Sequence, residues 1–326
     1  MSGVGPIRTA DRAAIEAAAS RLKAGGLVAF PTETVYGLGA DAANGEAVAK
    51  IFAAKNRPGF NPLIVHVGDR SEAAEHVRFT PPAEKLAETF WPGPLTLVLE
   101  RRDDCGFSDL VSAGLPTAAV RAPNHAIAQN LLRAAGFPIA APSANRSESV
   151  SPTRAVHVRE SLGTRAGMIL DGGACALGLE STVVDASEYP VRLLRPGGIP
   201  IEKLRAICEC ADDTREQSDR PRSPGRMLRH YAPALPLRIN CDNPPKGWAY
   251  LGIGPDRDHP LTKNLSEVGN LNEAAANLFA MLRELDKGEF SGIAVAPIPR
   301  EGLGAAINDR LSRARTEPRQ KRSRSD

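Results

Sequence analysis

The stretch GEAVAKIFAAKNRPGFNPLIVHV, residues 45–67, holds a helix, a charged turn and a strand in direct succession. Its first part, 45–54, predicts a helix, and the apolar run 63–67 predicts a buried strand. Lys55 and Arg57 lie in the turn between them, which Pro58 restricts. The same alternation extends outward, where it predicts helices at 11–24 and 124–135 and strands at 27–30, 95–99, 118–121 and 139–141.

Three later apolar runs, at 168–171, 181–185 and 191–195, predict strands that follow one another closely, and a short helix at 200–207 ends the region. Helices and strands thus alternate early in the chain and strands cluster late. This order is typical of an α/β domain with a mixed rather than a purely parallel sheet. We therefore expect one such domain over residues 8–207.

The rest of the chain changes character at residue 208. Residues 208–227 are charged, carry two prolines and have little apolar content, so the segment 208–233 is predicted to be a linker. A smaller Rossmann-like α/β domain is predicted over 234–315, without the glycine pattern of a dinucleotide site. Its expected strands are 235–239, 247–252 and 293–297, and its expected helices are 272–287 and 304–314. The basic tail 316–326 is predicted to be disordered.

Composition excludes several classes of protein. A net charge of +3 and an aromatic fraction of 5% argue against nucleic-acid binding as the main role. The five cysteines include no Cys-x-x-Cys pair, which argues against a zinc ribbon and favours free thiols. No signal-peptide pattern and no run of 18 apolar residues is present, so we expect a cytoplasmic protein with no membrane contact.

Two polar segments together indicate an anion site. The ammonium of Lys55 and the guanidinium of Arg57 suit a polyphosphate, and the turn at 143–145 adds hydroxyl and amide donors. A structural role is an open alternative, because cations are also favoured at the C-terminus of a helix. No Walker A pattern occurs, so a nucleotide site here is of another type.

Other polar residues leave alternatives open. Gly37 and Gly39 allow a ligand to approach the backbone, or they belong to a glycine-rich turn capped by threonines. His66 lies in an apolar strand, where a core histidine is the common case. Arg121 ends a strand and could hold a carboxylate with both arms of its guanidinium, or form a surface ion pair.

Taken in order, the motifs resemble one family, the YrdC-like threonylcarbamoyl-adenylate synthases. The matching segments are PTETVYGLG (31–39), KNRP (55–58), NPLIVHV (61–67), FWPGPLTLVL (90–99), VRAP (120–123), PSAN (142–145), SPT (151–153), DGG (171–173), ESTVVD (180–185) and LRPGG (194–198). HYAP (230–233) and PREGLGAAINDRL (299–311) resemble the long, two-domain form of the enzyme. The resemblance implies a twisted open sheet with a positively charged concave cavity.

The resemblance also implies a reaction. The family joins L-threonine, bicarbonate and ATP, with Mg²⁺ assisting, and forms threonylcarbamoyl-AMP and pyrophosphate. The product feeds the transferase machinery that makes threonylcarbamoyladenosine in tRNA. Adenylyl transfer of this kind needs no covalent nucleophile, so positioning and charge neutralisation are expected to supply most of the catalysis.

The family's functional residues map onto matching positions of this chain. Lys55 and Arg57 would be catalytic, and the ATP-binding set would be Lys55, Arg57, Asn61, Thr117, Ser143, Asn145, Ser151, Arg195 and Tyr231. L-threonine would be held by Thr34, His66, Arg121, Ala141 and Ser181, with Arg121 on its carboxylate. The linker 208–233 would act as a lid that excludes water. Asn56 departs from the family, where many members have Gly, but Asn tolerates the left-handed backbone well.

Three other functions were weighed from the sequence. A double-stranded RNA-binding module is the main alternative, with weak RNA binding as a possible accessory property; the modest charge argues against it. Carbamoyl transfer in hydrogenase maturation would need zinc-finger cysteine pairs and an acylphosphatase domain, and neither is seen. An inactive scaffold would not be expected to keep the whole polar set.

Overall fold

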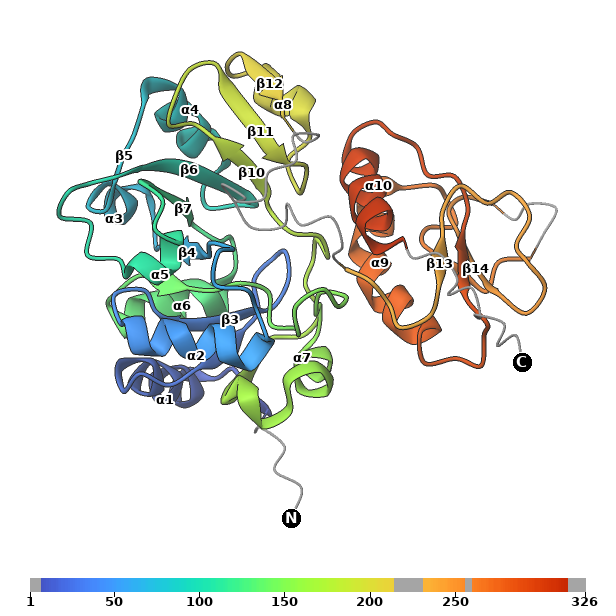
Figure 1. Ribbon diagram of the computed structural model, residues 1–326, viewed down its shortest axis with the longest axis horizontal. Coiled ribbons are helices and arrows are strands. Elements are labelled where there is room, and N and C mark those ends of the chain that lie inside the picture. The colour runs from blue at the N-terminus through green and yellow to red at the C-terminus, as the bar shows by residue number, and fades with distance from the viewer. Residues whose placement is uncertain (1–6, 214–230, 256–259, 316–326) are drawn as a thin grey trace, which may run out of the picture.

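The computed structural model describes residues 7–213, 231–255 and 260–315, which form a larger and a smaller lobe (Figure 1). The larger lobe is built on a 12-stranded sheet. In spatial order its strands are β1 (Ile7–Thr9), β9 (Met168–Asp171), β2 (Val28–Phe30), β3 (Gly37–Asp41), β8 (Ile139–Ala140), β4 (Ile64–His66), β7 (Thr117–Arg121), β6 (Leu95–Arg101), β10 (Thr182–Asp185), β11 (Val191–Arg195) and β12 (Cys210–Asp212), while β5 (Val77–Arg78) pairs with β6.

This sheet contains both parallel and antiparallel neighbours. Strands β4 and β7 run parallel, whereas β2 and β3 run antiparallel, as do β10 and β11. The predicted mixed sheet is therefore confirmed. The helices of this lobe are α1 (Arg12–Lys23), α2 (Gly45–Lys55), α3 (Arg70–Ala74), α4 (Pro81–Phe90), α5 (Asp109–Ser112), α6 (Ala126–Ala135), α7 (Ala155–Leu162), the 3₁₀ turn η1 (Gly163–Ala166) and α8 (Ile201–Arg205).

Local sequence explains where the principal helices begin and end. The Asp11 carboxylate accepts a hydrogen bond from the Ala14 amide and caps α1, and the Asn44 side chain caps α2 in the same way. Helix α2 ends at Lys55, and the residue that caps it, Asn56, is left-handed with φ of 52° and ψ of 46°. The expectation that Asn56 can adopt this backbone is confirmed. This conformation ends the helix and forms the turn over residues 55–57.

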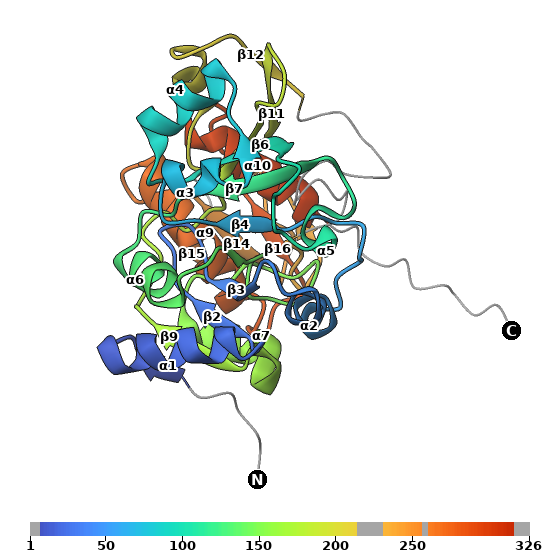
Figure 2. The same cartoon turned by 90° about the vertical axis from the view of Figure 1, so that its left-hand side faces the viewer.

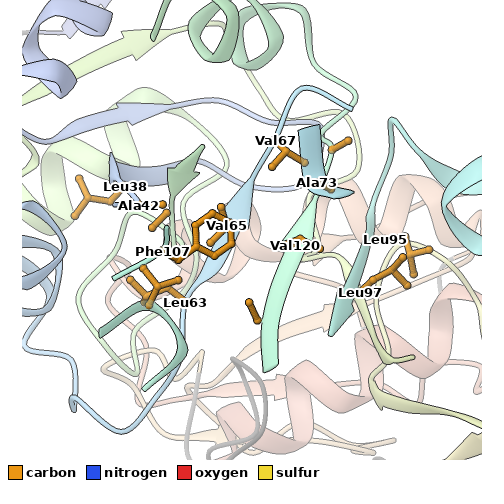
Figure 3. Close-up of a cluster of buried hydrophobic side chains, with 14 of the residues drawn as sticks. Leu38, Ala42, Leu63, Val65, Val67, Ala73, Leu95, Leu97, Phe107 and Val120 are labelled. Atoms are coloured by element: carbon orange, nitrogen blue, oxygen red, sulfur yellow. The ribbon is translucent and has the colours of Figure 1, made fainter. Parts of the chain in front are cut away.

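The main core lies where the apolar faces of the strands and helices meet. Leu63, Val65, Leu97 and Val120 come from β4, β6, β7 and the segment before β4, and all four are fully buried. Figure 3 shows these side chains gathered along one face of the sheet. A separate cluster fills the space between α1, α6 and the first strands. This packing fixes the ends of β4 and β7, which carry His66 and Arg121 toward the same place.

The smaller lobe contains a four-stranded parallel sheet. The strand order is β13 (Leu237–Arg238), β16 (Ile293–Val295), β14 (Ala249–Gly252) and β15 (Lys263–Asn264), and the helices are α9 (Leu271–Leu285) and α10 (Leu303–Ala314). Both helices lie on the side of this sheet that faces the larger lobe (Figure 1), and in the view turned by 90° the smaller lobe lies behind the larger one (Figure 2).

One part of the chain differs from the expectation of a glycine-rich turn. Gly37–Asp41 forms β3, which pairs with β2 and β8. Gly39 serves packing: a Cβ there would lie 2.8 Å from both Phe30 and Ile139. Gly39 is therefore required by its neighbours in the sheet rather than by a ligand.

A second difference concerns the segment predicted as a linker. Its first residues form β12, which adds a parallel strand beyond β11. The sheet therefore continues past residue 207, because an edge strand can be held by main-chain hydrogen bonds without an apolar pattern. Residues 214–230, most of the predicted lid, and the tail 316–326 lie outside the described residues.

Candidate active site

A cavity opens at the junction of the two lobes. Many of the residues predicted to bind a ligand line it. Its wall consists of Thr32, Thr34, Val35, Gly37, Arg57, Ile64, His66, Arg121, Ala141, Pro142, Ser143, Glu180, Ser181, Arg195 and Tyr231. The predicted residues Lys55, Asn61, Asn145 and Ser151 are buried in the protein around it.

The two polar segments singled out in the sequence meet directly. The Lys55 ammonium donates hydrogen bonds of 2.5 Å to the carbonyls of Ser143 and of Asn145. Burial, with a smaller contribution from the nearby Arg57, holds the pKa of Lys55 well below its usual value. The Asn145 amide nitrogen donates to Ser149, and its oxygen has no hydrogen-bond partner in the described part of the chain. Lys55 thus fixes the shape of the turn that presents Ser143 to the cavity.

Two guanidinium groups enter the cavity from different elements. Arg57 donates to the carbonyls of Asn61 (3.2 Å) and Pro62 (2.8 Å). Arg195, at the end of β11, donates to the carbonyl of Ser181 through Nε (3.1 Å) and Nη2 (2.9 Å). Burial lowers the pKa of Arg57 to about 10, and the charge of Arg195 contributes to the lowering. Both groups remain cationic at neutral pH, so this wall is electropositive.

Arg121 also lines the cavity and has partners that the sequence did not reveal. Its guanidinium donates to the Thr34 hydroxyl at 2.9 Å and to the Gly93 carbonyl at 3.1 Å, and it forms an ion pair of 2.6 Å with Glu33. The alternative of a surface ion pair is wrong, because the Arg121 side chain is only 4% exposed. A buried, neutralised guanidinium held rigidly in this way is suited to orient a second carboxylate.

His66 is both a core residue and a cavity residue. It packs edge-on against Phe30, with ring centroids 6.0 Å apart. Burial, assisted by the charge of Arg121, lowers the pKa of His66 to about 3, so the imidazole is neutral at physiological pH. Its Nδ1 atom has no hydrogen-bond partner among the described residues. A buried polar atom of this kind at a cavity wall is ready to bond a ligand.

Sequence reasoning placed Ser151 and Tyr231 at the site but assigned no role there to Glu180 or Arg310. Glu180 lines it, and its Oε1 accepts a 2.6 Å hydrogen bond from the Ser151 hydroxyl, so in this structure Ser151 is directed at Glu180. Arg310 donates to the other carboxylate oxygen at 2.7 Å. Tyr231 completes this wall and stacks on Phe279 of α9 with a centroid distance of 5.6 Å. The only sequence signal for Arg310 is the motif at 299–311, to which no role was given.

Thr117 is not brought to the cavity. It begins β7, whereas Arg121, which lines the cavity, ends the same strand. Four residues of extended strand span about 13 Å. Thr117 therefore stays a prediction that the cavity geometry does not support.

Comparison with known proteins agrees with this geometry. A family model described as telomere recombination matches residues 20–197, and one described as the C-terminal domain of threonylcarbamoyl-AMP synthase matches 199–315. The threonylcarbamoyl-AMP synthase of Bacillus subtilis is 42% identical over 92% of both chains, and that of Pyrococcus abyssi is 38% identical over 92% of this chain and 93% of its own. The chain belongs to the threonylcarbamoyl-AMP synthase family.

The structural match extends over both lobes. The crystal structure of P. abyssi Sua5 complexed with L-threonine has a TM-score of 0.86, covers 95% of this chain and 96% of its own, and is 37% identical in sequence. The two family models together account for the two-domain form of threonylcarbamoyl-AMP synthases that the sequence predicted. The arrangement of the lobes around the cavity is thus that of a solved family member.

Members of this family were expected to use Mg²⁺, and the described residues provide no resident site for it. No group of three or more His, Cys, Asp or Glu residues in the described ranges could hold a metal ion. Glu180 in the cavity wall pairs with Arg310, and Glu33 pairs with the cavity residue Arg121. All five cysteines are free thiols, as predicted. No helix in the described ranges has the length and apolar character that a membrane crossing requires.

Proposed function

We propose that this cavity makes threonylcarbamoyl-AMP from L-threonine, bicarbonate and ATP. The threonine nitrogen bonds to the bicarbonate carbon with loss of water, which gives a carbamate. A carbamate oxygen then bonds to the α-phosphorus of ATP as the bond to pyrophosphate breaks. The observation that carries this proposal is the convergence of Arg57, Arg121 and Arg195 with Ser143 of the 143–145 turn on one cavity.

The charged residues of the cavity support separate binding sites for the ATP phosphates and for the threonine carboxylate. Arg57 and Arg195 lie together and would neutralise the phosphates, where charge builds up as pyrophosphate leaves. Arg121 and the Thr34 hydroxyl, on the other side, would hold the threonine carboxylate. Holding the two anionic reactants in this orientation removes much of the entropic barrier to their reaction.

Two further groups would act on the threonine side. The neutral imidazole of His66 has an unpartnered Nδ1 within the described structure, which would bond a polar group of the amino acid. Ala141 limits the space beside it. No covalent intermediate with the protein is required, so the residues bind, orient and neutralise. Tyr231, buried between the lobes, would help exclude water from the adenylate.

Mg²⁺ would enter as part of the substrate, because this ion is commonly bound through the phosphates of a nucleotide. The product is a reactive mixed anhydride. It would pass to a transferase that acts on tRNA, and the cytoplasm is the compartment we propose for the reaction. Duplex RNA is not favoured as the main ligand, since the net charge is only +3.

Pyrophosphate release tests the proposal. The protein is incubated with MgATP and bicarbonate, with and without L-threonine, and pyrophosphate is measured over time. We expect release to require both L-threonine and bicarbonate. Release that continues at the same rate without L-threonine would show a generic ATP-cleaving site and would refute the proposal.

A further inference from the structure

One buried cation reaches the cavity wall from the smaller lobe. Arg310 is in α10, and its side chain is 1% exposed. Its Nε donates to Glu180 at 2.7 Å, and its Nη2 donates to the carbonyl of Pro196 at 2.9 Å. Its guanidinium carbon lies 5.1 Å from the centre of the Tyr231 ring. A single side chain thus contacts two residues of the wall, Glu180 and Tyr231, and the main chain at Pro196.

Glu180 is the reason why this cation is needed. It places a carboxylate in a wall that also contains Arg57 and Arg195. A bare anion at that position would repel the phosphates of a nucleotide, and the interaction would be strong because the site is shielded from water. It would also attract the guanidinium of Arg195, whose charge already influences Glu180. The ion pair with Arg310, whose guanidinium also contacts Asp309 at 2.6 Å, weakens both effects.

We propose that Arg310 is a positioning residue for ATP: it neutralises Glu180 and supports the Tyr231 ring, so that the charges of Arg57 and Arg195 act on the phosphates. This inference rests on the proposed function, since it assigns the nucleotide to the same cavity. The smaller lobe therefore contributes to nucleotide binding through a charge, in addition to covering the cavity.

A simpler explanation is that Arg310 merely joins the two lobes. The structure contains a matched contact that does only this. Lys287, two residues after the end of α9, forms a 2.7 Å ion pair with Glu160 of α7, and the two side chains are 62% and 36% exposed. Neither residue lines the cavity. Lys287→Gln therefore removes a cation and a contact between the lobes without touching the nucleotide site.

The test uses the full chain and measures the dissociation constant of MgATP by calorimetry, with KM values for ATP and L-threonine. Arg310→Gln should weaken ATP binding at least about tenfold, because it leaves Glu180 as an unpaired buried anion. Its KM for L-threonine should stay within about twofold. The double variant Arg310→Gln with Glu180→Gln should recover most of the lost ATP affinity, and Lys287→Gln should match the unaltered protein.

Glu180→Gln alone provides a second, independent test should Arg310→Gln fail to fold. Glutamine preserves the size of the side chain and can still bond both Ser151 and Arg310. ATP should then bind as tightly as in the unaltered protein, or more tightly. Weaker ATP binding by Glu180→Gln, or a double variant as weak as Arg310→Gln, would overturn the inference. An unaltered protein that does not bind ATP at all would instead refute the proposed function.

Discussion

Lys55 shows how a buried charge can organise a site. Its ammonium holds the carbonyls of Ser143 and Asn145 and is removed from water, with a pKa well below the usual value. A lysine so placed acts on the shape of the turn as well as on the field in the cavity. The charge of Lys55 therefore has two roles, a structural one in the turn and an electrostatic one in the cavity.

We expect Lys55→Met to reduce threonine-dependent pyrophosphate release about 100-fold or more, because the turn loses its anchor and the phosphates lose a nearby cation. Methionine retains most of the apolar volume. The matched control is Lys50→Met in the same helix, where the ammonium donates to the Gly25 carbonyl at 2.7 Å. The control should stay within about twofold of the unaltered protein. Equal activity of the two variants would contradict a role for Lys55 in the site.

His66 makes a prediction about pH. Its pKa is about 3 in the folded protein, where burial and Arg121 oppose the charge, against an ordinary value of 6.5. Between these two pKa values, His66 is therefore protonated in the unfolded chain and neutral in the folded chain. The stability that neutral His66 contributes is complete above pH 6.5 and is lost as the pH falls from there toward 3.

Replacing His66 by Gln should flatten this dependence. The variant cannot take up the proton, so the slope of the free energy of unfolding between pH 6.5 and 4 should fall by up to about 1.4 kcal/mol per pH unit. Urea unfolding at a series of pH values measures the slope. Some slope will remain, because His157 also has a lowered pKa, of about 4. An unchanged slope in the variant would mean that His66 is protonated in the folded state.

At the scale of elements, the junction between α2 and the following turn depends on one backbone conformation. Asn56 is left-handed, with φ of 52°. We expect Asn56→Gly to fold with nearly unchanged stability and activity, because glycine adopts this backbone without cost. Asn56→Val should lose about 1–2 kcal/mol of unfolding free energy and part of the activity. Equilibrium unfolding and pyrophosphate release measure the two effects, and equal behaviour of both variants would contradict the argument.

Elements with a clear apolar pattern could be predicted, and those made by main-chain pairing could not. The strands β4, β6 and β7 were expected because short apolar runs have few alternatives to burial. Strand β3 was not, since its glycines resemble a turn until Phe30 and Ile139 are seen to occupy the space. Strand β12 is polar and at an edge, and no pattern identified it.

The contacts of the candidate site also fall into those that the sequence could predict and those that it could not. Lys55 and the 143–145 turn could be paired from sequence because both carry recognisable polar motifs next to predicted elements. The contact between Glu180 and Arg310 joins residues 130 positions apart, and it exists only because α10 packs on the larger lobe. A pairing of this kind leaves no local trace in a single sequence.

At the scale of the whole molecule, one apolar cluster, separate from the main core, contains residues of both lobes. Val35, Val150 and Leu179 of the larger lobe belong to the same buried cluster as Leu278 and Phe279 of α9. Arg283, also of α9, donates to the carbonyls of Val150 and Ser151. Because these contacts border the cavity, the position of α9 determines whether the wall that contains Tyr231 and Arg310 is complete.

Gly178 allows α9 to approach this closely, and it provides a test of the argument. Its φ is +71°, and a Cβ there would lie 2.5 Å from the Cα of Ala276 and 2.7 Å from the carbonyl oxygen of Ala275. These are backbone atoms of α9, so Gly178→Ala must push the helix away. We expect a lower kcat/KM for ATP together with a lower free energy of unfolding.

The matched control for this variant is Gly136→Ala. Gly136 has a similar φ of +73°, but a Cβ there would meet nothing within 4 Å. It should carry only the backbone strain, about 1–2 kcal/mol of unfolding free energy, and keep its activity. Steady-state kinetics and urea unfolding of both variants separate the two effects. If Gly178→Ala retained the activity of the control, the position of α9 would not affect the cavity, and the smaller lobe would not contribute to activity in this way.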